Sequence, residues 1–229
     1  METAKTIQAL NVVYELAQES DVPELAILDR LQWGDVAATE EKILNRIQTF
    51  PQGSHIARVK ETGQIIAYLV LMRINYDFFS SKTWEEITHG GLIDNHINDG
   101  EYVYGVNLSV HPDHEENGIG GKMVDIGREF CKSINCKGII LGSRVPCYAH
   151  YLSNGGSGTP IDQYVFHRKD NEGRPYDDLL KFWSHFDFKP VKIVPNFMPD
   201  PDSCNFGVLC LWTNQNYLAE KPVVQACAG

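Results

Sequence analysis

The sequence predicts an α/β (α+β) protein with one mixed, mostly antiparallel central sheet flanked by helices. Three observations support this fold class. Apolar runs typical of strands recur along the 229 residues, separated by segments with helical spacing. Residues 54–60 and 64–74 form two such runs joined by Glu-Thr-Gly, as in a hairpin. Residues 109–134 give a strand end, Pro112, a polar loop, glycines and a helix, an order that often presents backbone N–H groups to a phosphate.

The chain begins with one predicted strand and two helices. Residues 12–20 alternate as a strand does, and the next segment predicts a helix with Pro23 in its first turn that ends near Gly34. Thr39 caps a second helix, which Pro51 ends. The hairpin follows, and its second strand is almost continuously apolar, which is typical of a strand covered on both faces.

The remaining chain alternates strands and helices. Ile119, Met123, Ile126, Phe130 and Ile134 share one face of the helix that follows the glycines. The other expected elements are a short helix near 83–87 inside an irregular insertion (76–100), strands at 101–110 and 137–143, a long stretch at 144–177 with a flexible Ser-Asn-Gly-Gly-Ser-Gly segment, a helix at 177–186, and an antiparallel pair at 189–194 and 205–212. No repeat or linker divides the chain, so residues 1–229 are expected to form one domain.

Composition narrows the possible partners. With 20 Lys and Arg against 30 Asp and Glu, the net charge of −10 argues against binding to nucleic acid or to anionic membranes. There is no apolar run long enough to cross a bilayer and no signal peptide, so a cytoplasmic location is expected. The six cysteines form no Cys-x-x-Cys pair and are expected to be reduced and mostly buried. His111 and His114 lack a second ligand pair, so no metal site is expected.

The order of elements and the glycine loop together resemble the GNAT acyltransferase superfamily. Its loop pattern, Gln/Arg-x-x-Gly-x-Gly/Ala, falls on residues 115–120, and the preceding strand end matches at Leu-Ser-Val-His-Pro. The resemblance implies a GNAT fold that binds acetyl-CoA or malonyl-CoA through the pyrophosphate of coenzyme A. The implied cofactor-binding residues are Leu108, Ser109, Val110, Glu115, Glu116, Asn117, Gly118, Ile119, Gly120, Gly121 and Lys122.

Two positions depart from the family pattern. Glu115 stands where members usually have Gln or Arg, and Glu116 adds a second carboxylate beside the expected phosphates. Trp183 stands where the family's usual acid, a Tyr, is expected. An indole cannot protonate a departing thiolate, so the common mechanism of small-amine acetyltransferases is not supported.

A narrower resemblance accounts for the missing Tyr. Residues 32–59, Tyr-Gly-Val-Asn-Leu-Ser-Val-His-Pro, Leu-Gly-Ser-Arg-Val-Pro and residues 203–212 are similar to the GNAT-like loading domains of modular polyketide synthases and to GNAT domains fused to carbon–nitrogen hydrolases. The polyketide group decarboxylates malonyl-CoA and loads an acyl carrier protein. The resemblance assigns catalytic roles to Trp33, Ser143, Arg144 and His167.

Other interpretations stay open. The chain could be an N-acetyltransferase for a small amine or a peptide amine, or a non-catalytic domain that binds acyl-CoA or a carrier protein. Trp33 could be core packing, and Ser143 could satisfy a backbone group at a strand end. Arg144 could pair with an acid, and His167 could be structural. If acyl-CoA failed to raise the melting temperature at saturating concentration, both enzymatic interpretations would be removed together.

Overall fold

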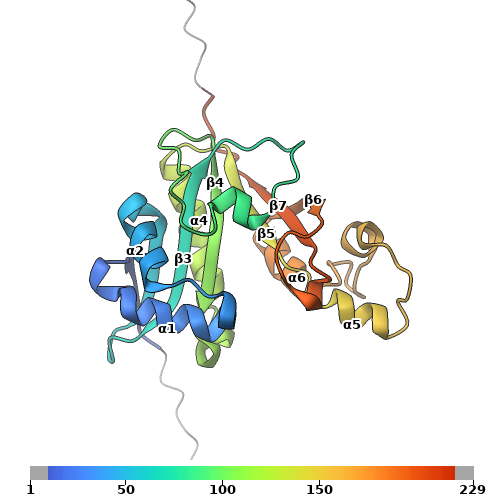
Figure 1. Ribbon diagram of the computed structural model, residues 1–229, viewed down its shortest axis with the longest axis horizontal. Helices are drawn as coiled ribbons and strands as arrows, with labels where there is room; N and C mark the ends of the chain where they lie inside the picture. The colour runs from blue at the N-terminus through green and yellow to red at the C-terminus, as the bar shows by residue number, and fades with distance from the viewer. Residues whose placement is uncertain (1–9, 220–229) are drawn as a thin grey trace, which may run out of the picture.

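Seven strands form one mixed sheet in the computed structural model, which describes residues 10–219 (Figure 1). The strands are β1 (Val12–Leu16), β2 (Ser54–Val59), β3 (Ile65–Ile74), β4 (Tyr102–Val110), β5 (Gly138–Ser143), β6 (Lys189–Val194) and β7 (Gly207–Thr213). Their order across the sheet is β1-β2-β3-β4-β5-β7-β6. Only β4 and β5 run parallel, and the other neighbours are antiparallel. This arrangement confirms the expected fold class.

Helices cover both faces of the sheet. They are α1 (Val22–Trp33), α2 (Glu40–Thr49), α3 (Trp84–Thr88), α4 (Ile119–Ser133), α5 (Tyr148–Ser153) and α6 (Asp178–His185). One apolar core packs α1, α2 and α3 against one face, and the other core packs α4, α5 and α6 against the opposite face. Strand β3 lies between the two cores and is buried at nine of its ten positions, which confirms the prediction for 64–74.

The apolar face predicted for α4 packs against the core. Ile119 and Met123 are buried, and Ile126, Phe130 and Ile134 are half-buried and pack against the same core. Val124, Gly127 and Cys131, which were not in the predicted set, are also buried. Gly127 faces β3, where a Cβ would make ordinary contacts with Leu69 at 3.5 Å and Leu71 at 3.7 Å.

The stretch 144–177 is more ordered than the sequence indicated. It contains α5 and a π-helical turn, Gln163–His167, neither of which was predicted. An aromatic cluster holds both elements, since the ring centroids of Tyr148 and Tyr164 are 4.9 Å apart and those of Tyr151 and Tyr164 are 5.2 Å apart. Tyr148 and Tyr164 are buried. Burial of these rings offsets the entropy of ordering a glycine-rich segment.

The sheet opens between β4 and β5, and this opening positions the site. The two strands pair at three positions only, the last being Gly105 with Leu141. Strand β4 then continues to Val110 paired with β3 only, while β5 remains paired with β7 through Ser143. A bulge at Val106 opposite Val70 and Leu71 bends β4 at the point where the strands separate. The gap leaves backbone and side chains of both strands free to line a cavity.

Candidate active site

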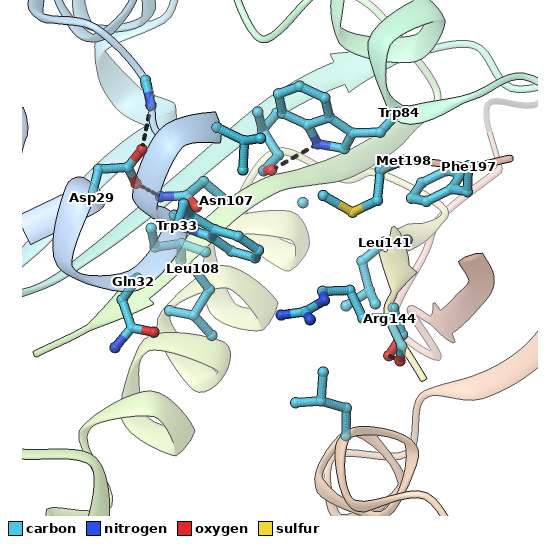
Figure 2. Close-up of a pocket in the computed structure, with 18 of the residues that line it drawn as sticks. Asp29, Gln32, Trp33, Trp84, Asn107, Leu108, Leu141, Arg144, Phe197 and Met198 are labelled. Atoms are coloured by element: carbon cyan, nitrogen blue, oxygen red, sulfur yellow. Dashed lines mark hydrogen bonds between the residues drawn. The ribbon is translucent and has the colours of Figure 1, made fainter. Parts of the chain in front are cut away.

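A cavity of ≈ 1110 Å³ lies where β4 and β5 separate (Figure 2). Its lining comes from β4, β5, helices α1, α2, α3, α4 and α6, and residues 196–199. Most lining atoms are apolar, with a few charged groups among them, which is typical of a small-molecule site. Leu108 and Val110 of β4 line it, whereas Ser109 points to the opposite side, toward α1, and is fully buried.

The turn after β4 places the N-terminus of α4 at one end of this cavity. Residues Pro112–Asn117 form a 3-10 turn, Gly118 has φ +71°, and α4 begins at Ile119. The first N–H groups of α4 have no acceptor within the helix, and the positive end of the helix dipole adds to their field. Gly120 in this first turn lines the cavity. These groups fit the pyrophosphate of an acyl-CoA whose arm would enter between the strands.

The three loop positions differ in how strongly the backbone conformation or the packing requires glycine. Gly118 adopts a left-handed conformation that favours glycine. A Cβ on Gly121 would lie 2.9 Å from Cζ of Phe186, so Gly121 allows α4 and α6 to pack closely. A Cβ on Gly120 would make only ordinary contacts, with the nearest atom 3.6 Å away on Val110. Packing against the rest of the protein therefore does not demand glycine at 120.

One of the two acidic side chains of the loop, Glu115, is held by hydrogen bonds. Gln32 of α1 donates from Nε2 to Oε1 of Glu115 at 3.0 Å and also to the Val110 carbonyl, so the Glu115 carboxylate is tied toward α1. Glu116 belongs to the same turn, and its side chain is outside the described part of the structure. Asn117 and Lys122 are exposed, and Lys122 provides a positive charge on the first turn of α4.

Trp33 is held by a buried hydrogen-bond network. Its indole Nε1 donates to the Ser109 hydroxyl at 3.0 Å, and that hydroxyl donates to Oδ1 of Asp29 at 2.9 Å. Asn107 Nδ2 donates to the same carboxylate oxygen at 2.9 Å, and the Ala38 N–H donates to Oδ2 at 2.7 Å. The half-buried indole of Trp33 lines the cavity, so this network fixes the orientation of one wall.

Arg144 lies across the cavity from Trp33 (Figure 2). Its Nε and Nη2 donate to the two oxygens of buried Asp200 at 2.7 and 2.8 Å, and this hydrogen-bonded pair raises the pKa of Arg144. The remaining guanidinium donors are free to meet a ligand. Ser143 also lines the cavity, but it is 2 % exposed and its hydroxyl donates to the Arg144 carbonyl at 2.8 Å.

His167 is not brought together with Trp33, Ser143 and Arg144. It is exposed at the end of the π-helical turn and lines a separate hollow of ≈ 640 Å³, with Arg168 and Lys169 as neighbours. His150 and His185, the other histidines of this half of the chain, are exposed and do not line the main cavity. Among the described lining residues of that cavity there is no histidine, tyrosine or cysteine.

Three lining residues were not singled out from the sequence. Asp29 is 3 % exposed and anchors the Trp33 network, Arg46 is 2 % exposed, and Trp84 donates from Nε1 to the Val106 carbonyl at 3.1 Å. Asp29 and Arg46 lie on the apolar faces of α1 and α2, beside Leu28 and Ile47. A charged residue on an otherwise apolar helix face is the signal that could have identified both.

The described residues also bear on metal binding and on membrane insertion. Within residues 10–219, no cluster of three or more His, Cys, Asp or Glu side chains is arranged to bind a metal ion. No helix in that range has both the length and the apolar character needed to span a membrane. The described cysteines are free thiols, of which Cys131, Cys136 and Cys210 are buried, and Cys227 lies outside the described residues.

Known proteins resemble the chain in sequence. The protein YhcX of Bacillus subtilis (strain 168), described as a probable hydrolase, is 30 % identical over 183 residues, which cover 79 % of this chain and 34 % of YhcX. The chain thus spans about a third of that relative. YkwB of the same organism, described as an uncharacterized N-acetyltransferase, is 28 % identical over 180 residues, covering 78 % of this chain and 76 % of YkwB.

Solved structures share the fold. The loading GNATL domain of CurA from Lyngbya majuscula superposes with a TM-score of 0.78 at 22 % identity, covering 89 % of this chain and 98 % of that domain. The GphF GNAT-like decarboxylase in complex with isobutyryl-CoA gives a TM-score of 0.74 at 20 % identity, covering 88 % and 98 %. The acetyltransferase (GNAT) family model matches residues 22–150, more than half of the sequence. The chain therefore belongs to the GNAT acetyltransferase family, whose members are acyl-CoA-dependent acyltransferases.

Proposed function

We propose that this acyltransferase binds malonyl-CoA, removes the malonyl carboxylate as CO₂, and passes the resulting acetyl group to the thiol of an acyl carrier protein. The observation that carries the proposal is the chemistry of the cavity lining. Trp33 and Arg144 face each other across it, while its described lining residues include no histidine, tyrosine or cysteine. The cavity therefore offers an aromatic wall and hydrogen-bond donors, and the candidate bases among its described lining residues are carboxylates and Lys42.

This lining suits a thiol acceptor better than an amine. An alkyl amine is an ammonium ion at neutral pH, with a pKa near 10.4 in the case of lysine, so its attack on a thioester requires a base. A thiol ionises at about 8.5, and exchange between two thioesters is nearly balanced in energy, so positioning matters more than proton removal. In the transfer step, the acceptor sulfur bonds to the carbonyl carbon, the bond to the sulfur of coenzyme A breaks, and the departing thiolate takes up the proton that the acceptor loses.

Decarboxylation needs stabilisation of an enolate. The bond between the carboxylate carbon and the α-carbon breaks, CO₂ leaves, and the electron pair passes to the thioester oxygen; a proton from water then converts the enolate to the acetyl thioester. The donors of Arg144 that do not bind Asp200 would hydrogen-bond that oxygen, and the pair with Asp200 fixes the plane of the guanidinium. The indole of Trp33 would exclude water from the reacting centre.

Two relatives support the proposal by analogy only. The structure of GphF is described as that of a decarboxylase and the CurA structure as that of a loading domain, and both share this fold at 20 % and 22 % identity. The proposal leaves His167 outside the chemistry, because its side chain lies at the separate hollow. A catalytic role for His167 stays a prediction that the His167→Ala variant tests.

Mass spectrometry of malonyl-CoA after incubation with the purified protein tests the proposal. We expect conversion to acetyl-CoA, and acetylation of a phosphopantetheinylated carrier protein when one is added. Conversion should fall at least tenfold in Trp33→Leu and Arg144→Gln and remain in Arg30→Gln, whose exposed side chain does not line the cavity. Unchanged malonyl-CoA would remove the decarboxylation step, and faster transfer from acetyl-CoA to a small amine than to any carrier protein would remove the thiol acceptor.

A further inference from the structure

Arg46 is a buried guanidinium next to the Tyr68 hydroxyl and the Gly91 carbonyl. It lies on α2, is 2 % exposed, and donates from Nε to the Gly91 carbonyl at 2.7 Å. Its Nη1 is buried without a hydrogen bond, and among the described side chains no carboxylate lies within ion-pair distance of it. A guanidinium carries five N–H donors, so most of its capacity is unused. A buried charge in this state is unfavourable unless an anion compensates it.

The buried carboxylate of the same cavity, Asp29, has its hydrogen-bonding capacity largely filled. Asp29 accepts three hydrogen bonds, from Ala38, Asn107 and Ser109, and all three donors are neutral. Arg46 is therefore not the counter-ion of Asp29. Glu85 also lines the cavity, but it is exposed to solvent. The guanidinium of Arg46 thus has no direct carboxylate partner among the described residues of the cavity.

A second cation stands on the same wall. Lys42 precedes Arg46 by four residues on α2, so both side chains project from one side of the helix, and both line the cavity. Lys42 is half-buried and makes no ion pair within the described part of the chain. The guanidinium of Arg46 lies beside the Trp84 ring, and the loop at Gly91 packs against both. A Cβ on Gly91 would lie 2.8 Å from Arg46 Nη2 and 2.7 Å from the Trp84 ring.

These cations lie at the end of the cavity opposite the phosphate loop. The loop follows Val110, whereas Trp84, beside Arg46, is hydrogen-bonded to Val106. Four residues of strand separate these points, about 13 Å. An acyl-CoA with its pyrophosphate at the loop would direct its acyl end toward Trp84, so Arg46 and Lys42 would meet the acyl group or the incoming acceptor rather than the phosphates.

We infer that Arg46, assisted by Lys42, binds a carboxylate of the substrate at the acyl end of the cavity. The inference rests on the proposed function for the direction in which acyl-CoA lies. The carboxylate belongs either to a dicarboxylic acyl group, such as malonyl or succinyl, or to an acceptor. A planar carboxylate accepts two parallel hydrogen bonds from a guanidinium, which fills the donors that the protein leaves open.

Two binding arms distinguish the sources of the carboxylate. In the first arm, calorimetry compares malonyl-CoA and succinyl-CoA with acetyl-CoA and butyryl-CoA. In the second arm, protein saturated with acetyl-CoA is titrated with 3-mercaptopropionate and with 1-propanethiol. We expect one arm to show at least tenfold tighter binding of the carboxylate member, and that preference to disappear in Arg46→Gln. Arg46→Lys should restore part of it, because the charge remains without the planar fork.

Controls separate this role from a structural one. Lys42→Gln, at a half-buried position that the fold tolerates, should reduce the preference several-fold, and Arg30→Gln, which removes the same charge outside the cavity, should leave it intact. Acetyl-CoA should bind the Arg46 variants as it binds the parent protein. A parent protein that binds acetyl-CoA without any carboxylate preference, or a preference that survives in Arg46→Gln, overturns the inference alone. Failure to bind any acyl-CoA removes the proposed function and the inference together.

Discussion

Asp29 illustrates how one residue can set the geometry of the site without touching the reacting atoms. Its two carboxylate oxygens accept hydrogen bonds from a backbone N–H, a side-chain amide and the Ser109 hydroxyl. That hydroxyl in turn accepts a hydrogen bond from the Trp33 indole. The carboxylate thereby joins the end of α1 to the segment before α2 and to β4. Loss of one acceptor would leave a buried donor unpaired, so the network is sensitive to small chemical changes.

Asp29→Asn tests this positioning role. An amide has one acceptor oxygen, so at least one of the three donors loses its partner, and we expect a loss of about 1–3 kcal/mol in the free energy of unfolding. Turnover of malonyl-CoA should fall more than its KM changes, because the altered wall acts on the reacting group and not on the phosphate loop. Asp35→Asn, at a fully exposed side chain on the same wall, is the control. Equal turnover in both variants would contradict the role.

Asp200 gives the Arg144 pair a defined pH dependence. Burial acts to raise the pKa of Asp200, but hydrogen bonds from Arg144 and Ser203 outweigh burial and hold this pKa below its ordinary 3.8. The unfolded chain therefore binds the proton more readily than the folded chain. The stabilisation is complete above about pH 5 and is lost as the pH falls through 3.8 and then the lower folded value.

The corresponding variant is Asp200→Asn. At neutral pH its free energy of unfolding should be lower by about 2 kcal/mol, because Arg144 and Ser203 lose a charged acceptor. Below about pH 4 the gap between variant and parent should narrow, since the parent carboxylate is itself being protonated. Urea titrations across this range measure the gap, with exposed Asp202→Asn as the control. A gap that stays constant with pH would show that the ion pair does not provide the difference.

The predictability of the site residues depended on local signals. Trp33, Ser143 and Arg144 were identified because they lie in short segments similar to a known family, and all three line one cavity. Asp29 and Arg46 were missed because their significance depends on partners such as Ser109 and Gly91, 80 and 45 residues away. His167 could not be placed, because the fold of residues 144–177 depends on aromatic contacts that no periodic pattern encodes.

At the scale of elements, residues 118–121 at the junction of β4 and α4 meet three separate structural requirements. Gly118 fulfils a backbone requirement, Gly121 a packing requirement, and Gly120 leaves space on the cavity side. The bulge at Val106 then directs the open part of β4 away from β5. Together these features place the start of a helix at the mouth of a split sheet, which an unbroken sheet would not allow.

A series of three alanine substitutions separates the constraints. Gly118→Ala should destabilise the protein by about 1 kcal/mol through backbone strain, and Gly121→Ala by about 1–3 kcal/mol through its contact with Phe186. Gly120→Ala should leave the free energy of unfolding almost unchanged and weaken acetyl-CoA binding about tenfold, because the methyl group occupies space near the ligand. Phe186→Leu should relieve Gly121→Ala. If Gly120→Ala destabilised the protein and bound acetyl-CoA normally, packing would be its role.

Regular elements were predictable where the apolar period was long. Strand β3 and the capped helix α2 follow their patterns, with Thr39 accepting from the Lys42 N–H at 3.3 Å. The apolar face of α4 was predictable, but the burial of Gly127 was not, because glycine counts as neither apolar nor polar in such a pattern. Element α5 was missed because its order comes from Tyr148 packing on distant rings rather than from helical spacing.

At the scale of the whole molecule, the cavity lies where the two halves of the sheet are joined only weakly. Strands β4 and β5 pair at three positions only, and residues of α1, α4 and α6 line the cavity beside them. A ligand that contacts both strands would replace the missing contacts between the two halves of the sheet. Binding should therefore stabilise the entire fold and not just the loop that holds the phosphates.

Thermal unfolding with acetyl-CoA measures this coupling. At a concentration 100 times Kd, one bound ligand adds about 2.7 kcal/mol, which for a chain of this size corresponds to a rise in Tm of roughly 5–10 °C. ATP, which carries the adenine nucleotide and phosphates without the pantetheine arm, should produce a much smaller rise at the same concentration. Gly120→Ala should reduce the acetyl-CoA effect without lowering the Tm of the free protein. Equal shifts with ATP and acetyl-CoA would mean that the phosphates alone are held and that the arm does not enter between β4 and β5.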